Sequence, residues 1–433
     1  MEQDNYRLSD DTRRTDELEE LAQLLPEEDL LGDATELPTL FPEAEKKAED
    51  APLERPRRRN RRWYHTLLRV LAVVLKYVVA IVLTVAILAG GLVGYLTVTE
   101  YTPAYAEAAQ MGTVRSEKKL NTRTLRLMTF NTGYAALGED ADFFMDGGKG
   151  VRAASEETVV ENMIGIEELI KSIDADVLLL QEVDTDSDRS YHRNQWQQYE
   201  HDLGSYESYF ALNYSCRYVP YPLSERIGEV HSGIATYSRY AVRATADEDD
   251  SFEARSATRY SLPCPFSWPV RVANLKRCLL LTRIPLENSD RELVVINLHL
   301  EAYEDGEGRI EQTRRLMELM EQEYAKGNYV IAGGDFNQSF PNAEAVYPVK
   351  NAELWQPGRL ETPERGWSYV CDTATPSCRL LNQPYAPSSP ETQYYVIDGF
   401  LVSPNITVDS VETVNAGFVN SDHNPVVVEI TLD

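Results

Sequence analysis

Residues 77–98 form an apolar run of 22 residues without a charged side chain. At a rise of about 1.5 Å per residue, a helix of this length spans roughly 33 Å, enough to cross a hydrocarbon core of about 30 Å. A cleaved signal peptide is the first alternative, but it begins near the N-terminus and has an apolar run of only about 7 to 15 residues. A buried core helix is the second, but it needs no run of arginines at its start. We therefore predict one transmembrane helix over residues 66–98.

The charges around this run predict its orientation. Residues 55–65 are a basic juxtamembrane segment with six Arg and no acid, and Trp63 and Tyr64 are typical of a membrane interface. Residues 1–54 hold 18 Asp/Glu against 5 Lys/Arg, which predicts an acidic, disordered cytoplasmic tail. Because positive charge stays on the cytoplasmic side, we expect a single-pass protein of the cell membrane. Its N-terminus is cytoplasmic, and everything after residue 99 is extracellular.

The region after residue 123 has the texture of a large domain. Residues 99–123 are a polar connector, and residues 124–433 alternate short apolar runs with amphipathic segments. This pattern is typical of an α/β or α+β sandwich. The predicted strands are residues 125–130, 177–181, 233–237, 277–284, 293–298, 329–332, 395–402 and 426–432, and the predicted helices are residues 159–172 and 309–326.

Polar side chains cluster at the ends of the predicted strands. Six short motifs carry them: FN, QEV, NLH, GGDFN, IDG and SDHNP. The candidate residues are Asn131, Glu182, His299, Asp335, Asn337, Asp398, Asp422 and His423. Taken singly, each is more often a turn residue, a cap or a structural pair, so the joint order carries the argument.

These residue types suit phosphoester hydrolysis. A hard dication such as Mg²⁺ takes oxygen ligands, which Glu182 provides with help from Asn131 and Asp422. Charge that develops on phosphoryl oxygens needs positioned donors, for which His299, His423 and the Asn337 amide are candidates. A water nucleophile needs a base, and either Asp335 or His423 fits that role.

The six motifs, in this order over residues 124–433, resemble those of the endonuclease/exonuclease/phosphatase superfamily. The resemblance implies a four-layered sandwich of two mixed β-sheets flanked by helices, and Mg²⁺- or Mn²⁺-dependent cleavage of a phosphoester by an activated water. It implies metal binding by Glu182 with Asn131 and Asp422. It also makes Asp335 the favoured base beside Asn337 and His299, with His423 and its partner Asp398 stabilising the transition state.

Charge narrows the substrate class. Residues 99–433 carry 52 Asp/Glu against 29 Lys/Arg, whereas proteins that bind long nucleic acids normally present a basic surface. We therefore expect a phosphodiesterase or phosphatase that acts outside the membrane on a small or lipid-linked phosphoester. An extracellular nuclease acting on extended nucleic acid is the disfavoured alternative. A non-catalytic membrane receptor on a hydrolase scaffold is the third reading.

Several other residues have two readings at this stage. Arg255, Arg259 and Arg283 could contact a phosphate or form salt bridges, and His231 could face the site. Among the five cysteines, Cys371 and Cys378 could close a short disulfide loop outside the membrane or remain buried thiols.

Overall fold

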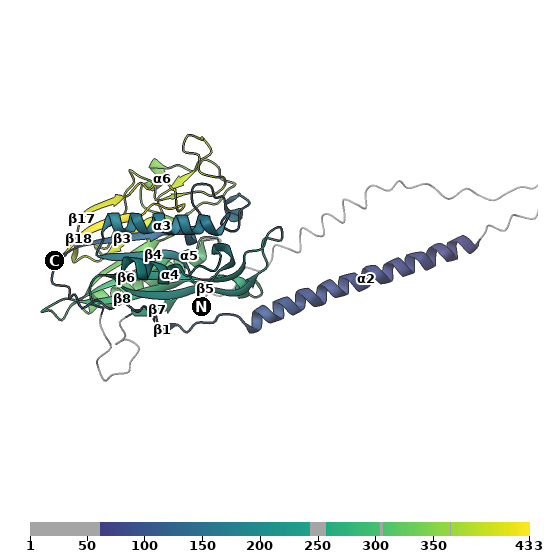
Figure 1. Cartoon of the computed structure of the whole chain (residues 1–433), viewed down its shortest axis with the longest axis horizontal. Coiled ribbons are helices and arrows are strands. Elements are labelled where there is room, and N and C mark those ends of the chain that lie inside the picture. The colour runs from purple at the N-terminus through teal and green to yellow at the C-terminus, as the bar shows by residue number, and fades with distance from the viewer. Residues whose placement is uncertain (1–60, 243–256, 304–305, 364) are drawn as a thin grey trace, which may run out of the picture. The chain divides into compact units, whose positions relative to one another are not determined.

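The structure, a computed structural model, describes residues 61–242, 257–303, 306–363 and 365–433 (Figure 1). The predicted tail at residues 1–54, most of the basic segment and Arg255 lie outside the described residues. The chain divides into two units, and the second, Lys76–Asp433, holds the sandwich and all candidate site residues.

The predicted apolar helix is present as α2, Arg61–Val98. Its mean hydropathy reaches 2.7 and none of its most apolar window is buried in the protein, so it is long and apolar enough to cross a membrane. In the part of the chain that the structure describes, it is the one helix with these properties. Thr84 and Thr97 donate their hydroxyls to the carbonyls of Ala80 and Val93, so these polar side chains are satisfied within the helix.

The rest of the described chain forms two seven-stranded sheets. The first has the order β17-β18-β3-β4-β6-β5-β2, and only β3 and β4 run parallel. Its strands are β17 (Ile406–Thr413), β18 (Val426–Leu432), β3 (Thr124–Asn131), β4 (Val177–Asp184), β6 (Gly228–Ser238), β5 (Glu207–Val219) and β2 (Gln110–Met111).

The second sheet has the order β1-β7-β8-β9-β10-β16-β13, and only β9 and β10 run parallel. Its strands are β1 (Ala106–Ala108), β7 (Ala257–Ser261), β8 (Cys278–Pro285), β9 (Glu292–His299), β10 (Tyr329–Asp335), β16 (Asp398–Val402) and β13 (Ser368–Val370). Both sheets are mixed, as predicted.

The layers follow from the two-residue period of the strands. In β4, Leu179 faces the core between the sheets, while its neighbours Leu178 and Leu180 pack against the helices α3 (Glu156–Ile173) and α4 (Gln195–Leu203). In the second sheet, Ile296 packs under the helix α5 (Glu307–Ala325). Strands buried on both faces read as continuous apolar runs, which is why the sequence revealed them. The four-layered sandwich is confirmed, with α3 and α4 in front of the first sheet in Figure 1.

Local signals fix where α3 begins and ends. Ser155 Oγ accepts the Thr158 N–H at the first turn, Glu156 and Glu157 lie where the helix dipole favours acids, and Lys171 lies in the last turn. Asp174 adopts a left-handed conformation and ends the helix. This helix covers the predicted residues 159–172, as α5 covers nearly all of 309–326.

A buried amide joins the two sheets. Asn297 Nδ2, from β9, donates to the carbonyls of Leu180 (3.1 Å) and Ala235 (2.9 Å) in the first sheet. Its Oδ1 accepts from Gln181 Nε2 at 2.7 Å. All of these groups are fully buried, so the three hydrogen bonds replace water and fix the register of one sheet on the other.

Other parts of the chain depart from the sequence reading. The predicted strand at residues 395–402 is two strands, because β15 (Tyr394–Tyr395) pairs with β14 (Cys378–Arg379) before β16 begins. The connector contains β1 and β2, which pair with different sheets. The remaining short elements are β11 (Gln338–Ser339), β12 (Gly358–Arg359), α6 (Ala343–Val346), and the 3-10 helices η1 (Gly133–Ala135), η2 (Phe144–Asp146), η3 (Asp188–Ser190) and η5 (Val270–Ala273).

The possible disulfide between Cys371 and Cys378 is not present. All five cysteines lie in the described residues and all are free thiols. Cys378 is buried and belongs to a small apolar cluster, whereas Cys371 packs at the edge of the α5 core. The reading as small apolar side chains is the correct one.

Candidate active site

The strand register brings the predicted residues to one end of the sandwich. Asp335, the last residue of β10, lies opposite His299 at the end of β9 and opposite Asp398 at the start of β16. In the first sheet, Asn131 at the end of β3 is paired with Gln181, which precedes Glu182 in β4. The loop before β18 adds Asp422 and His423, and an isolated bridge pairs His423 with Cys378.

Asp398 orients His423. Its Oδ2 lies 2.8 Å from His423 Nδ1 and accepts the Ser377 hydroxyl at 2.7 Å. The same Ser377 Oγ accepts the Asp398 N–H, so the carboxylate is held in place. Burial lowers the pKa of His423, but the Asp398 carboxylate outweighs burial, and the pKa lies well above its usual value. The His423 ring is therefore an imidazolium at neutral pH, with Nε2 left to face the site.

Asp335 lies at the centre of the cluster. The Asn131 amide donates to its Oδ2 at 3.1 Å, and the Asn337 N–H donates to its Oδ1 at 2.8 Å. The same Oδ2 lies 3.5 Å from His299 Nε2 and 3.9 Å from His423 Nε2. Burial, followed by the nearby Asp398 charge, raises the pKa of Asp335 to about 7. This carboxyl can both accept and release a proton near neutral pH.

The two histidines carry different charges. Burial lowers the pKa of His299 well below its usual value, and the nearby Arg277 and His423 cations lower it further. His299 is therefore neutral where His423 is cationic. Two histidines beside one carboxyl thus have distinct roles set by their surroundings.

The glycines of the GGDFN motif allow β9 and β10 to approach. A Cβ on Gly334 would lie 2.0 Å from the Leu298 carbonyl oxygen, which no real side chain tolerates. Asn337 follows with a left-handed backbone (φ 51°), and its Nδ2 donates to the Leu300 carbonyl at 2.9 Å. Gly334 therefore permits the close approach of β9 and β10 that positions Asp335 against His299.

Glu182 and Asp422 form the anionic side of the site. The pairing of β4 with β6 shifts between Leu180 and Val183, and Glu182 has a left-handed backbone (φ 54°) at this bulge. Its side chain remains 24% exposed, whereas that of Asp422 is 9% exposed. Burial raises the pKa of Asp422 to about 7, and the Glu182 and Asp146 carboxylates add to the effect, against His423 and Arg379. Acidic oxygens gathered with too little positive charge fit a hard dication.

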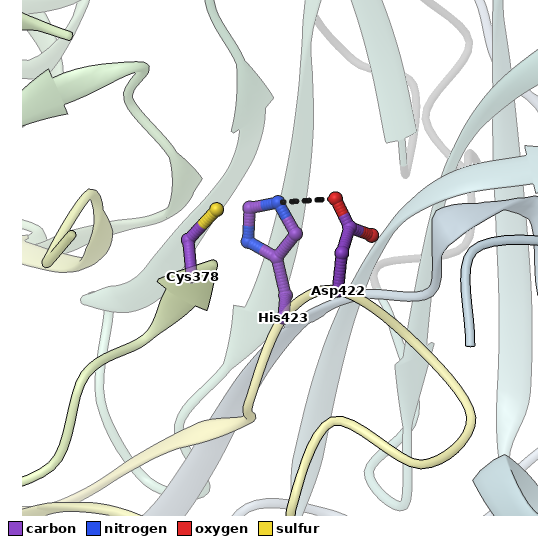
Figure 2. A group of neighbouring side chains, drawn as sticks. All are labelled: Cys378, Asp422 and His423. Carbon is purple, nitrogen blue, oxygen red and sulfur yellow. Dashed lines mark ion pairs between the residues drawn. The ribbon is translucent and has the colours of Figure 1, made fainter. Parts of the chain in front are cut away.

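Cys378, Asp422 and His423 converge on one another in Figure 2, with His423 Nε2 3.8 Å from Asp422 Oδ2. Burial raises the pKa of the Cys378 thiol to about 12, so the thiol keeps its proton and is a poor ligand. A second metal-compatible group contains Asp335, Asp398 and His423. Within it, Asp335 Oδ2 accepts from the Asn131 amide and Asp398 Oδ2 lies 2.8 Å from His423 Nδ1, whereas His423 Nε2 faces the site.

The family model described as "Endonuclease/Exonuclease/phosphatase family" matches residues 128–423, more than half of the chain. The chain belongs to this family. It is thus a metal-dependent phosphoesterase of the endonuclease/exonuclease/phosphatase type. A search of curated protein sequences gives no significant match.

Three solved structures are similar to this chain, and the first of them shares its fold. The endonuclease/exonuclease/phosphatase from Beutenbergia cavernae DSM 12333 is 20% identical, with 72% of each chain covered and a TM-score of 0.50. A family protein from Leptotrichia buccalis C-1013-b is 14% identical over 71% of this chain and 100% of that one, with a TM-score of 0.45. The human nocturnin catalytic domain is 16% identical over 75% of this chain and 97% of that one, with a TM-score of 0.43.

Within this member of the endonuclease/exonuclease/phosphatase family, several residues near the site lay outside the sequence prediction. Asp146 is buried, accepts the Tyr303 hydroxyl at 2.7 Å, and contributes to the field at Asp422. Arg189 pairs with Asp184 through two hydrogen bonds of 2.9 and 3.0 Å, and its guanidinium lies 3.6 Å from the centre of the Tyr134 ring. Of these residues, Tyr134 and Asp184 could have been found from the sequence, because they lie three residues after Asn131 and two residues after Glu182.

The candidate phosphate contacts have other partners. Arg283 is bound by Glu323 through two hydrogen bonds of 2.7 Å each, far along β8 from the site end. Arg259 donates to the carbonyls of Leu212 and Lys276. His231 Nδ1 lies 3.1 Å from Ser215 Oγ, and its Nε2 lies 3.3 Å from Glu229. The salt-bridge alternative is correct for Arg283 and for Arg259, whose Nε also lies 3.6 Å from Glu107 Oε1.

Proposed function

We propose that this protein is a membrane-anchored hydrolase that uses a divalent cation and an activated water to cleave a phosphoester outside the membrane. The observation that carries the proposal is the position of Asp335 Oδ2, 3.5 Å from a neutral histidine and 3.9 Å from a cationic one. A base, a neutral imidazole and an imidazolium thus meet at one point, beside the Glu182 and Asp422 carboxylates. Phosphoester hydrolysis needs a base for the attacking water and positive charge for the phosphoryl oxygens.

Glu182 and Asp422, with the Asn131 amide oxygen, would hold the cation, Mg²⁺ or Mn²⁺. When bound, the cation supplies positive charge to the phosphoryl oxygens and lowers the cost of their developing charge. The partly exposed Glu182 carboxylate and the buried Asp422 carboxyl support this ligand set, because a dication would relieve the repulsion between two ionised acids.

Asp335 is the proposed base. Its pKa of about 7 leaves part of the population ionised at neutral pH, so the carboxylate can take a proton from an attacking water. The Asn131 and Asn337 hydrogen bonds fix its two oxygens. His423, kept cationic by Asp398, would stabilise the negative transition state through Nε2. His299 is a further donor, and so is the second N–H of Asn337 Nδ2, whose first N–H donates to the Leu300 carbonyl.

The helix α2 supports the membrane location. Six arginines precede its apolar core, so we place the N-terminus in the cytoplasm and the sandwich outside the cell. Residues 99–433 carry 52 Asp/Glu against 29 Lys/Arg, and this negative charge works against extended nucleic acid as a substrate and favours a small or lipid-linked phosphoester.

Turnover by the full-length protein in lipid nanodiscs tests the proposal. The panel contains bis-p-nitrophenyl phosphate, plasmid DNA, a phospholipid headgroup ester and inositol phosphates, with Mg²⁺, with Mn²⁺ or with EDTA. We expect cation-dependent hydrolysis that is lost in Asp335→Asn and His423→Ala. Efficient plasmid cleavage would show that the protein is a nuclease. A folded protein that is inactive on every substrate would favour the non-catalytic membrane receptor.

A further inference from the structure

The last turns of α2 pack against the sandwich. Leu96 is 4% exposed and shares an apolar cluster with Val219, Ile227 and Val272, and Leu92 lies at the edge of this cluster. Val219 and Ile227 flank the turn between β5 and β6, and Val272 lies in η5. The end of the apolar helix is therefore joined to two specific loops, at residues 220–227 and 264–274.

Polar contacts at the same place strengthen the junction. Trp268 Nε1 donates to Thr97 Oγ1 at 3.0 Å. Arg271 donates to both oxygens of Glu100, at 3.0 and 3.2 Å, and Lys276 Nζ lies 3.1 Å from the same carboxylate. The Glu100 side chain is 6% exposed and that of Lys276 is 11% exposed, whereas the Arg271 side chain is 45% exposed, so the junction is shielded around the carboxylate and Lys276.

This junction lies at the active-site end of the sandwich. β6 runs antiparallel to β4, with Ser232 opposite Asp184 and Ser238 opposite Val177. The beginning of β6, and hence the β5–β6 turn, is therefore beyond the end of β4 that carries Glu182. Phe144 belongs to the same apolar cluster and contacts the Tyr221 ring at 5.3 Å between centres.

The Phe144 segment leads directly to the site. Two residues after Phe144, the Asp146 carboxylate contributes to the field at Asp422, and its Oδ2 accepts the Leu381 N–H at 3.2 Å. A continuous set of contacts thus runs from the end of the apolar helix, through the two loops, to the edge of the catalytic cluster.

Exposed apolar side chains lie on the two loops that are joined to the end of α2. Leu223 is 93% exposed at the tip of the β5–β6 turn, and Trp268 is 57% exposed beside Thr97. Tyr221 (59%) and Val270 (58%) accompany them on the same two loops. We call these four residues the apolar rim. Exposing such side chains to water is unfavourable, and tryptophan is enriched where a membrane meets water.

The position of Leu92 and Leu96 across the bilayer indicates what covers the apolar rim. If α2 crosses the bilayer, Leu92 and Leu96 lie in its outer part, since about 20 residues are needed to reach across. Side chains that pack on Leu92 and Leu96 must then lie at the level of the lipid headgroups. The rim flanks these contacts, so its natural occupant is the lipid surface around the protein's own helix.

We propose that the apolar rim inserts into the headgroup layer around α2, and that the substrate is a phosphoester carried by a lipid of that same leaflet. The second half of this inference rests on the proposed hydrolase function, whereas the first half does not. Because the rim and the catalytic cluster share one end of the sandwich, insertion places the site against the layer where lipid phosphates lie.

Fluorescence tests the insertion independently of catalysis. Full-length protein is placed in nanodiscs whose lipids carry bromine, a contact quencher, near the headgroup end of the acyl chain. The chain has five tryptophans, so Trp268→Phe isolates the contribution of Trp268. We expect this variant to lose a quenchable component that wild type shows. The matched control is Trp367→Phe, which removes a tryptophan that is 5% exposed and packed in the α5 core, and should leave the quenched component unchanged.

Turnover tests the substrate class. The double variant Leu223→Asn with Val270→Asn should lower hydrolysis of a phospholipid headgroup ester by about tenfold, because two apolar anchors are lost. Hydrolysis of water-soluble bis-p-nitrophenyl phosphate should not change. Ile164→Asn, at an exposed position on α3 (51%), is the control that should change neither rate.

The outcomes separate the two proposals. A Trp268 emission that brominated lipid does not quench overturns insertion, even if the enzyme is active. Quenching together with equal effects of the double variant on both substrates overturns the lipid substrate. Quenching without any phosphoester turnover refutes the hydrolase function and leaves the inserted rim standing.

Discussion

His423 Nδ1 lies 2.8 Å from Asp398 Oδ2, and the two side chains are respectively 6% and 1% exposed. The residues are 25 positions apart in the sequence and come from the β18 loop and from β16. Because this pairing is shielded from water, it keeps the imidazole both oriented and charged.

Replacing Asp398 by Asn removes the charge but keeps the size of the side chain. The His423 pKa should fall, so that a neutral ring replaces the cation, and kcat/KM should fall by about a hundredfold or more. Steady-state kinetics with bis-p-nitrophenyl phosphate measures the change. Asp409→Asn, on the exposed strand β17, is the control and should have wild-type activity. An Asp398→Asn variant with unchanged kcat/KM contradicts a catalytic role for the pair.

Enzymatic activity plotted against pH should rise through an acidic limb and fall through an alkaline limb. Asp335 must lose its proton to act as base, so activity should rise with pH through about 7. More Mg²⁺ should move this limb to lower pH, because a nearby cation favours the carboxylate. The alkaline limb reports deprotonation of His423 and should move to lower pH in Asp398→Asn. An alkaline limb that stays in place in this variant would assign the limb to another group.

Glu182→Gln should weaken cation binding. Replacing groups that only orient metal ligands typically costs about 10- to 100-fold in affinity, so loss of a ligand charge should cost at least about tenfold. Titration calorimetry of the full-length protein with Mn²⁺ measures the affinity without any substrate. Glu168→Gln, an exposed position on α3, should bind as wild type does. Equal affinities for both variants would place the cation elsewhere.

The Arg283–Glu323 pair should support stability in a pH-dependent way. Burial raises the pKa of Glu323, but hydrogen bonds from Arg283 outweigh burial and lower it. Glu323→Gln removes the two-point acidic partner of a buried guanidinium and leaves only Glu292, 3.2 Å from Arg283 Nη1, so it should cost about 3 kcal/mol of unfolding free energy at pH 7. Since the folded pKa is lowered, the contribution is present above the unfolded value of about 4.3 and is lost as pH falls through the folded pKa.

Urea denaturation at several pH values measures this effect. The gap between wild type and Glu323→Gln should shrink below about pH 4. The exposed pair of Arg359 with Glu344 provides the matched comparison, and Glu344→Gln should change stability by less than about 1 kcal/mol at any pH. A gap for Glu323→Gln that grows on acidification would contradict the assignment.

The sequence predicted the parts of the fold that are buried on both faces. Leu178, Leu179 and Leu180 read as one apolar run because one layer of helices and the other sheet cover opposite sides of β4. β5 was not predicted, because its 13 residues mix polar and aromatic side chains, such as Asn213 and Tyr214. The Tyr214 hydroxyl donates to the carbonyl of Ala273, which lies far away in the sequence. β7 was missed in a segment that shows no alternation.

The same distinction separates the predicted site residues from the missed ones. Asp335 and Glu182 follow apolar strands, so their common position at a sheet end could be inferred from the sequence. Asp146 ends the short helix η2 and Ser377 lies in a loop, and only the folded chain brings them to Asp422 and Asp398. No local pattern encodes a contact between residues 377 and 398, because it depends on how a loop meets the start of β16.

The amide of Asn297 makes the site sensitive to events deep in the protein. The acidic oxygens of Glu182 belong to one sheet, while Asp335 and His299 belong to the other, so the gap that a phosphoryl group must fit is set by how the sheets are seated. Asn297 holds the two sheets together at Leu180 and Ala235. A substitution at Asn297 that shifts one sheet relative to the other should therefore change the width of the active site, although Asn297 itself is not a catalytic residue.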